Sequence, residues 1–485
     1  MNRQIRRLGI AMLVLFGALF VQLNVIQVLR ADAYNDNPNN TRAIVRDFSR
    51  PRGQIVAADG TVLARSVPAE GRFERQRQYP EGELFAGVTG YFSFIAGAEG
   101  VERTYNDVLA GRTTQTVSDI GELLLGEPRT ADVTLTIPTD VQRVARDALG
   151  GTRGSVVALD PRDGAVLALW NFPSYDPGLL SSVDIEAAQA ARDRLLADEN
   201  SPLLPATYRE TFFPGSTFKV VTAAAGLSSG RVSVAAPAYP SSSAYVPPLT
   251  RNPINNFGNS TCGGTLADIL RVSCNTAFAQ MGVDLGAEVL VGQAEAFGFN
   301  DVPPLDLPGV EPSPIGDVAS FVQNTPVLAM TAIGQNAVRS TPLQMALVAA
   351  GVANGGQVMV PHVMAEVRDD RGEVIDRFEP QLWTRATSPA VAATVTEAMV
   401  RVVEDGTASR LSVPGVSTAG KTGTAQLGNG LSHAWIVGFA PADAPRVAVA
   451  VIVEAQPGAS EQTGGRVAAP IAQAVLSAAL DATSP

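Results

Sequence analysis

Two pairs of strand-like segments, far apart in the chain, most constrain the fold. In the segment 154–170 (GSVVALDPRDGAVLALW), two apolar runs flank the turn sequence Pro161-Arg162-Asp163-Gly164, which is typical of a β-hairpin. A second pair of apolar runs, 433–441 and 446–455, precedes a helical pattern at 465–480. The sequence between the two pairs is largely helical in pattern. We therefore predict an α/β domain whose sheet joins segments from both ends of the chain.

The N-terminal segment is predicted to lie in a membrane. Arg3, Arg6 and Arg7 precede an uncharged apolar run at 8–29, which as a helix is long enough to cross a bilayer. The basic flank favours a cytoplasmic stub at 1–7, a transmembrane anchor at 8–29, and an extracytoplasmic remainder. A signal peptide cleaved near residues 31–33 is the alternative, and it sends the same residues across the membrane.

Composition excludes some partners. The net charge of -11 and the pI near 4.9 argue against a nucleic-acid partner, and they indicate that any anionic polymer must be bound in a shaped cleft. The two cysteines, Cys262 and Cys274, can pair outside the cytoplasm or remain as buried free thiols. No further ligands accompany them, so neither a metal nor another cofactor is predicted.

Between the anchor and residue 131 the sequence has no long periodic helix. Residues 51–66 predict two short strands around the turn Asp59-Gly60, within a small extended module at 30–130. A strand is expected at 132–137, followed by a helix capped by Thr136 or Thr139. We expect the main domain to span 131–485.

Lysine is rare in this chain and its two positions are informative. Of 36 basic residues only Lys219 and Lys421 are lysines. Lys219 follows Ser216 by three residues in a predicted helix, so both side chains share one face, with Ser216 near the positive end of the helix dipole. A lysine that burial and a nearby cation keep neutral can deprotonate the serine, whereas arginine cannot. By itself, however, a Ser-x-x-Lys pair is more often incidental.

Two further motifs accompany this pair. Lys421 opens Lys421-Thr422-Gly423-Thr424 in a predicted strand, where Gly423 would let a substrate backbone approach closely. Between the two lysines lies Ser273-Cys274-Asn275. The three elements occur in the order S-x-x-K, S-x-N and K-T-G, and together they contain both lysines.

These residues resemble the active-site motifs of the penicillin-recognising serine transpeptidases. The segments 52–64 and 91–111 look like the N-terminal module of class B penicillin-binding proteins, closest to the actinomycete penicillin-binding protein A group. Further segments look like parts of their transpeptidase domain: 171–178 (NFPSYDPG), 212–219 (FFPGSTFK), 331–346 (TAIGQNAVRSTPLQMA) and 404–411 (EDGTASRL). The resemblance implies an α/β fold with an antiparallel sheet flanked by helices, as in β-lactamases.

The resemblance also implies roles for individual residues. Ser216 would attack the carbonyl of the penultimate D-alanine of a stem pentapeptide, with Lys219 as the base. Ser273 would relay a proton to the leaving D-alanine with the help of Lys421. Asn275 would bind the peptide amide of the donor. Thr422 and Thr424 would meet its terminal carboxylate, and the backbone N–H groups of Ser216 and Thr424 would form the oxyanion hole. Apart from the resemblance, a disulfide between Cys262 and Cys274, if these cysteines pair, would stiffen one wall of the cleft.

The implied function is that of a monofunctional D,D-transpeptidase that cross-links peptidoglycan during division or growth. Its partners would be stem peptides ending in D-Ala-D-Ala, β-lactams, the cytoplasmic membrane, a separate glycosyltransferase and division proteins. A non-enzymatic membrane β-lactam sensor or division scaffold is the alternative, and carboxypeptidases and β-lactamases share the same residues. A hydrolase built on Ser228 and His433 is disfavoured, because a helix rather than a strand is expected before Ser228.

Overall fold

The computed structural model describes residues 2–25, 48–71, 73–112, 130–427, 430–455 and 463–483. The chain forms two compact units, Met1–Pro51 with Val67–Gln76, and Arg52–Ser66 with Arg77–Pro485. The first unit contains helix α1 (Asn2–Asn24), of which Arg3–Asn24 is long and apolar enough to cross a membrane. Helix α1 overlaps the predicted anchor at 8–24, whereas residues 26–29 and the alternative cleavage site lie outside the described residues.

A five-stranded antiparallel sheet forms the centre of the second unit. Its order is β17-β18-β19-β7-β8, and β19 pairs with β7 along its length. The predicted hairpin near residue 160 and the predicted C-terminal strand pair therefore meet in one sheet, as expected. The strands are β7 (Gly154–Leu159), β8 (Val166–Phe172), β17 (Ala419–Gln426), β18 (Ser432–Ala440) and β19 (Val447–Val453).

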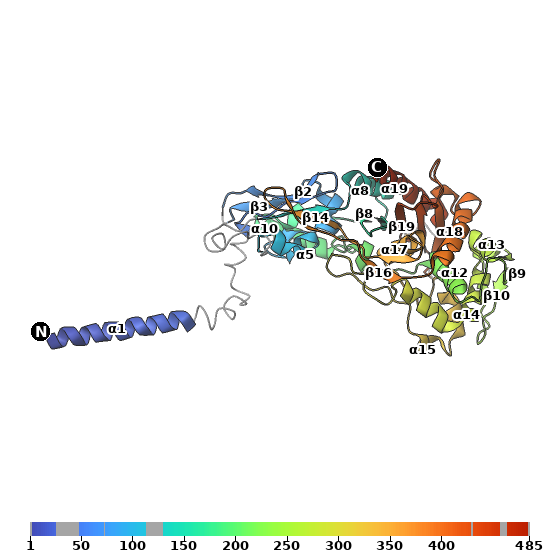
Figure 1. The fold of residues 1–485 in the computed structure, drawn as a ribbon, viewed down its shortest axis with the longest axis horizontal. Helices are drawn as coiled ribbons and strands as arrows, with labels where there is room; N and C mark the ends of the chain where they lie inside the picture. Colours follow the sequence, from blue (N-terminus) through green and yellow to red (C-terminus); the bar gives the residue numbers. More distant parts are fainter. Residues whose placement is uncertain are drawn as a thin grey trace. The chain divides into compact units, whose positions relative to one another are not determined.

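Helices cover both faces of this sheet. Figure 1 shows α8 (Thr139–Leu149) and α19 (Ala469–Ala482) on one side of β8 and β19, and α17 (Pro342–Ala353) on the other. All residues of α17 from Pro342 to Val352 are buried, which explains why this helix is apolar on every side. Beyond it, α12 (Lys219–Ser228) packs against α14 (Asn275–Ala296) and α18 (Pro389–Glu404).

The start of α8 differs from the prediction. Neither Thr136 nor Thr139 caps the helix with its own side chain. Instead the carboxylate of Asp59, in the turn of the N-terminal hairpin, accepts hydrogen bonds from Thr139 N at 2.9 Å and Thr139 Oγ1 at 3.1 Å. The Thr136 hydroxyl donates to Val166 O at 2.7 Å. A distant carboxylate thus satisfies the helix N-terminus, which local sequence could not reveal.

A second sheet contains strands from both sides of residue 130. Strand β1 (Ile55–Val56) is antiparallel to β2 (Val62–Pro68) and parallel to β6 (Asp132–Leu135). Strand β6 in turn pairs with β14 (Met364–Arg368), which pairs with β15 (Val374–Arg377). The two strands expected around Asp59-Gly60 are present, and they share their sheet with residues of the main domain.

A buried ion cluster stabilises this region. The fully buried Glu102 accepts hydrogen bonds at 2.6 Å from Arg52 Nε and at 2.6 Å from Arg77 Nε. Burial by itself would raise the pKa of Glu102, but Arg77 and Arg52 outweigh that effect and lower it. Arg77 also donates to Gly53 O at 2.8 Å, so the cluster joins the start of β1 to the short helices near residue 102.

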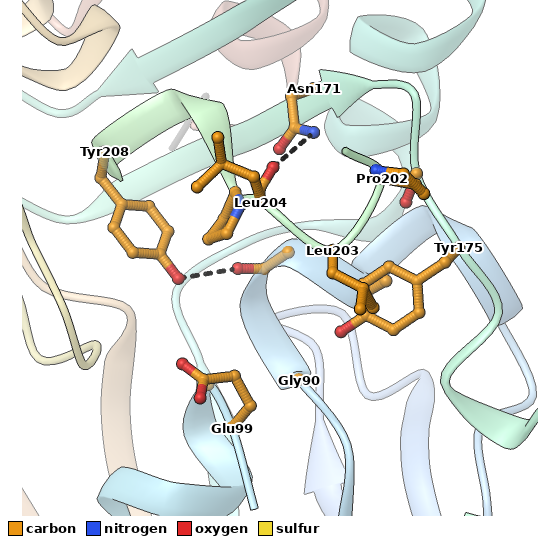
Figure 2. Close-up of a pocket in the computed structure, with 13 residues that line it drawn as sticks. Gly90, Glu99, Asn171, Tyr175, Pro202, Leu203, Leu204 and Tyr208 are labelled. Atoms are coloured by element: carbon orange, nitrogen blue, oxygen red, sulfur yellow. Dashed lines mark hydrogen bonds between the residues drawn. The ribbon is translucent and has the colours of Figure 1, made fainter. Parts of the chain in front are cut away.

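The short elements between 82 and 109 pack closely on the main domain. Figure 2 shows Tyr208 donating to Gly87 O and the Asn171 amide donating to Leu204 O, with lengths of 3.3 and 3.5 Å. The cavity between these segments is only about 10 Å³, so it holds one water at most. The elements in this region are η2 (Gly82–Phe85), α4 (Ala86–Thr89), β4 (Phe92–Ser93), β5 (Gly97–Ala98), α5 (Val101–Thr104), α6 (Asn106–Leu109) and α11 (Ala206–Arg209).

The remaining described elements are short connections and peripheral helices. They are β3 (Arg75–Gln78), α9 (Pro177–Leu180), α10 (Ile185–Ala197), η4 (Gly215–Phe218), β9 (Tyr239–Ser242), β10 (Ala244–Tyr245), β11 (Ile254–Asn255), η5 (Phe257–Asn259), β12 (Cys262–Gly264), α13 (Leu266–Arg271), α15 (Val318–Phe321), α16 (Thr325–Thr331), β13 (Gln357–Met359), β16 (Leu382–Arg385), η6 (Ser409–Leu411) and η7 (Gly464–Ala468).

Candidate active site

Ser216 lies in a tight turn that a distant glycine holds in place. The turn is the 3-10 segment η4, and the α-helix α12 begins only at Lys219, later than predicted. Gly215, at φ +54°, donates its N–H to Gly334 O at 2.9 Å. Gly334 has φ +82°, and a Cβ there would lie 1.9 Å from Gly215 O. Only glycine therefore fits at 334 without displacing the turn that carries Ser216.

Lys219 is fully buried at the start of α12. Its Nζ donates to Ser273 O at 2.8 Å and to Asn275 Oδ1 at 2.7 Å, and it lies 3.3 Å from Ser273 Oγ. Burial, and next the charge of Lys421, lower its pKa well below the ordinary value. A neutral amine has two N–H groups, and the two carbonyl oxygens use both. Its lone pair is then free to accept a proton from a hydroxyl.

Lys421 reaches the same serine from the opposite side. Its Nζ donates to Ser273 Oγ at 2.8 Å and to Thr422 O at 2.9 Å. Burial lowers the pKa of Lys421 to about 7. The hydroxyl of Ser273 thus lies between the two lysines of the chain, and the three motifs meet at this atom. Within the part of the chain that the structure describes, Lys219 Nζ hydrogen-bonds to Ser273 and Asn275 and forms no hydrogen bond with Ser216 Oγ.

The turn that carries Ser273 is held from several sides. Ser273 has φ +59°, a conformation that non-glycine residues rarely adopt. A disulfide joins its neighbour Cys274 to Cys262 in β12, and Cys274 N donates to Ile269 O at 2.8 Å. The Lys219 hydrogen bond to Ser273 O adds a further restraint. Asn275 then begins α14, and its Nδ2 donates to Asn255 O at 2.9 Å, which orients its Oδ1 toward Lys219.

These motifs open onto one large cavity of about 1080 Å³. Ser216, Ser273, Asn275, Thr422 and Thr424 all line it. Of the predicted site residues, the structure brings these five hydroxyl or amide side chains to the surface of the cavity and buries the two lysines behind them. No group of three or more His, Cys, Asp or Glu side chains that could hold a metal occurs in the described ranges.

Gly423 packs closely against the turn that carries Ser216. It is not among the cavity-lining residues, and a Cβ there would lie 2.9 Å from Pro214 O and 3.0 Å from Trp435 Cβ. The absent side chain therefore lets β17 pack closely against the turn before Ser216. Close approach of a substrate backbone at Gly423 stays a prediction.

Sequence reasoning did not assign Gly334 or Thr407. Thr407 Oγ1 lies 2.6 Å from Thr422 Oγ1, so it orients the hydroxyl of the K-T-G motif. Both residues lie in segments already singled out by their resemblance, 331–346 and 404–411. That resemblance was the only signal for them, because neither residue type indicates chemistry.

The alternative hydrolase site is not assembled. Ser228 is the last residue of α12 and its hydroxyl hydrogen-bonds to Thr387 Oγ1 at 2.9 Å, so it does not follow a strand. His433 packs edge-on against Phe212, with ring centroids 5.3 Å apart, and its Nδ1 accepts from Ala455 N at 3.1 Å. Burial, and then nearby arginines, lower the pKa of His433 to about 4. These contacts explain His433 as a packing residue.

The sheet flanked by helices, with a serine turn and two buried lysines meeting at a second serine, defines the class of penicillin-recognising serine enzymes. Residues 154–477 match the family model "Penicillin binding protein transpeptidase domain", and residues 52–133 match "Penicillin binding protein A dimerisation domain". The chain therefore belongs to the penicillin-binding protein transpeptidase family, in its class B.

Individual members of this family are similar to the chain over most of its length. It is 40% identical to peptidoglycan D,D-transpeptidase PbpA of Mycolicibacterium smegmatis, over 99% of both chains. Identity to PbpA of Mycobacterium tuberculosis is 38%, again over 99% of both. The structure of the penicillin G acyl-enzyme complex of penicillin-binding protein A from M. tuberculosis has a TM-score of 0.81 and 38% identity, covering 89% of this chain and 100% of that one. A D,D-transpeptidase domain from Eggerthella lenta has a TM-score of 0.78 and 33% identity, covering 90% of this chain and 99% of that one.

Proposed function

We propose that this protein is a monofunctional peptidoglycan D,D-transpeptidase that forms an acyl-enzyme on Ser216. The observation that carries the proposal is the position of Ser273 Oγ, 3.3 Å from Lys219 Nζ and 2.8 Å from Lys421 Nζ, in the cavity that Ser216 also lines. A hydroxyl held between two amines of lowered pKa can transfer protons, which an enzyme requires and a non-enzymatic scaffold does not. The activity of the relatives with 38–40% identity supports the same reaction class.

In the first half of the reaction, Ser216 Oγ attacks the carbonyl carbon of the penultimate D-alanine of a stem peptide. The neutral amine of Lys219 takes the hydroxyl proton, because burial and Lys421 disfavour its charged form. The backbone N–H groups of Ser216 and Thr424 stabilise the oxyanion. Ser273 then passes a proton to the departing amine, and Lys421 holds the Ser273 hydroxyl in position.

The substrate is held by polar groups along the cavity. Thr422 and Thr424 bind the terminal carboxylate of the donor, and Thr407 fixes the hydroxyl of Thr422. Asn275 binds the peptide amide. In the second half of the reaction, the amine of another stem peptide takes the acyl group. A β-lactam mimics the donor and leaves a persistent acyl-enzyme, as the acyl-enzyme complexes of the M. tuberculosis relative support.

The membrane arrangement follows from the N-terminal charges. Arg3, Arg6 and Arg7 precede the apolar part of α1 and favour a cytoplasmic start, a span at 8–29, and a catalytic domain at 131–485 outside the membrane. The disulfide between Cys262 and Cys274 fits an oxidising compartment. Glycan strands would come from a separate membrane glycosyltransferase, and division proteins would position the enzyme.

The test is the intact mass of the detergent-solubilised protein mixed with benzylpenicillin, followed over time. A long-lived adduct of one drug mass is expected in the wild type, absent in Ser216→Ala and much slower to form in Lys219→Arg. An adduct that clears within seconds would instead indicate a β-lactamase. If no adduct forms at all, the non-enzymatic scaffold is the interpretation that remains. Release of D-alanine without transfer to an amine acceptor would identify a carboxypeptidase.

A further inference from the structure

The wall of the active-site cavity is cationic although the protein is acidic. The chain carries 47 acidic and 36 basic side chains, a net charge of -11. Yet none of the described residues that line the cavity is Asp or Glu, whereas Arg410 and Arg466 both are lining residues. The two lysines behind the wall are buried and their pKa values are lowered, so the charge that the wall presents is that of Arg410 and Arg466. The cavity therefore concentrates positive charge at the one place where a substrate binds.

The two arginines belong to segments that pack tightly beside the K-T-G motif. Arg410 lies in η6 and Arg466 in η7, and Arg410 Nη1 lies 3.4 Å from Arg466 O. Gly465, next to Arg466, approaches Thr407 so closely that a Cβ would overlap its carbonyl oxygen. Because Thr407 Oγ1 is 2.6 Å from Thr422 Oγ1, the backbone that carries both arginines is held at the Thr422 side of the cavity.

Both guanidinium groups are available to a ligand. Arg410 and Arg466 are solvent-exposed, and within the described ranges the structure pairs neither of them with a carboxylate. Arg153, by contrast, pairs with Glu454 at 2.7 Å. An unpaired guanidinium presents N–H donors in a planar fork that matches a carboxylate. The ligand group that fits this wall is therefore an oxyanion, and the carboxylate is the one that the proposed reaction supplies.

The order of events in the proposed reaction indicates which carboxylate this is. In that reaction the leaving D-alanine carries an amine and a carboxylate on one carbon, and its carboxylate lies at Thr422. The acceptor amine attacks along the path by which the leaving amine departed, because deacylation by an amine is the reverse of acylation. An acceptor with a carboxylate on its amine-bearing carbon thus places that group at the same wall.

We propose that Arg410 and Arg466 select acceptor amines that carry a carboxylate on the amine-bearing carbon. This inference rests on the proposed function. In the transfer, the acceptor nitrogen forms a C–N bond with the acyl carbon while the bond from that carbon to Ser216 Oγ breaks. The proton lost by the amine returns to Ser216 Oγ through Ser273 and Lys219. The arginines stay charged throughout and only bind the acceptor.

The test uses a thioester donor whose leaving group carries no carboxylate, so that acylation does not involve the arginine wall. D-Alanine and D-alaninamide serve as matched acceptors that differ only in this carboxylate. Acyl transfer to each, and hydrolysis without acceptor, are measured for the full-length wild type, Arg410→Gln, Arg466→Gln and the double variant. Arg401→Gln, an exposed arginine of α18 outside the cavity lining, is the matched control.

Each cavity variant is expected to lower kcat/KM for D-alanine about tenfold, the loss of one charge-assisted hydrogen bond. Transfer to D-alaninamide, hydrolysis and the melting temperature should match the wild type, and Arg401→Gln should change none of them. An equal loss of kcat/KM for D-alanine and D-alaninamide would overturn the assignment. So would a double variant whose ratio of kcat/KM for D-alanine to kcat/KM for D-alaninamide equals that of the wild type. If the wild type shows hydrolysis but no transfer to any acceptor, the proposed transpeptidase function fails, and the assignment with it.

Discussion

Substitution of Gly334 by alanine should slow acylation of Ser216 without unfolding the protein. A Cβ at 334 would lie 1.9 Å from Gly215 O, whereas real Cβ contacts stay above 3.0 Å, so the two segments must separate by about 1 Å. Gly215 O is a backbone atom, so no side-chain rotation relieves the overlap. Displacing a reacting group by about 1 Å costs about 100-fold in rate. We therefore expect the second-order rate constant for benzylpenicillin acylation to fall about 100-fold.

Gly372→Ala is the matched control for this experiment. Gly372 has the same φ of +82° as Gly334, but an added Cβ meets nothing within 4 Å. Both variants should lose about 1–2 kcal/mol from the left-handed backbone conformation, and only Gly334→Ala should lose acylation rate. The assay is stopped-flow or mass-resolved acylation beside a melting curve. If benzylpenicillin acylates Gly334→Ala at the wild-type rate, or acylates Gly372→Ala as slowly as Gly334→Ala, the argument that Gly334 positions Ser216 is refuted.

Three other variants test groups in the interior. Burial lowers the pKa of Lys421 from 10.5 to about 7, so between these values the unfolded chain binds the additional proton. The free energy of unfolding of the wild type, relative to that of Lys421→Met, should therefore increase by a few kcal/mol as the pH rises from about 7 to 10.5. Denaturant titrations across this range measure it, and a difference that does not change with pH would contradict the lowered pKa. Glu102→Gln leaves two buried arginines without their counter-charge and should cost about 3–5 kcal/mol, which a melting curve would detect; a change below 1 kcal/mol would show that water reaches the cluster. Removing the disulfide with Cys262→Ala and Cys274→Ala opens a loop of sequence separation 12, and it should cost about 3 kcal/mol and slow acylation through Ser273. Wild-type acylation by the double variant would mean that the remaining hydrogen bonds suffice to hold the turn.

Features that depend on nearby residues were predictable from the sequence. Strands β7, β8, β18 and β19 follow from their continuous apolar runs and the turn at 161–164. The spacing of three residues brings Ser216 and Lys219 into neighbouring turns, although the 3-10 turn that carries Ser216 was not anticipated, and the action of Lys219 as the base for Ser216 stays a prediction. The scarcity of lysine drew attention to Lys421, which no local pattern would have linked to Ser216.

Features that depend on packing between distant segments appeared only in the tertiary structure. Ser273 Oγ lies between the two lysines because α12, α14 and β17 meet there, and the apolar packing that brings them together involves the whole core. Asp59 reaches the start of α8 by the same kind of long-range contact.

The sequence alone determined the identity of the elements, the order of the motifs and the chemistry that each side chain can perform. It did not determine the close packing of Gly423 and Gly334 on the Ser216 turn, nor the cationic wall in a chain of net charge -11. Local backbone preference and hydrophobic periodicity act over a few residues, and they leave a clear pattern in the sequence. Burial, shifted pKa values and charge distribution arise from atoms that come together only when the core closes, so only the tertiary structure decided them.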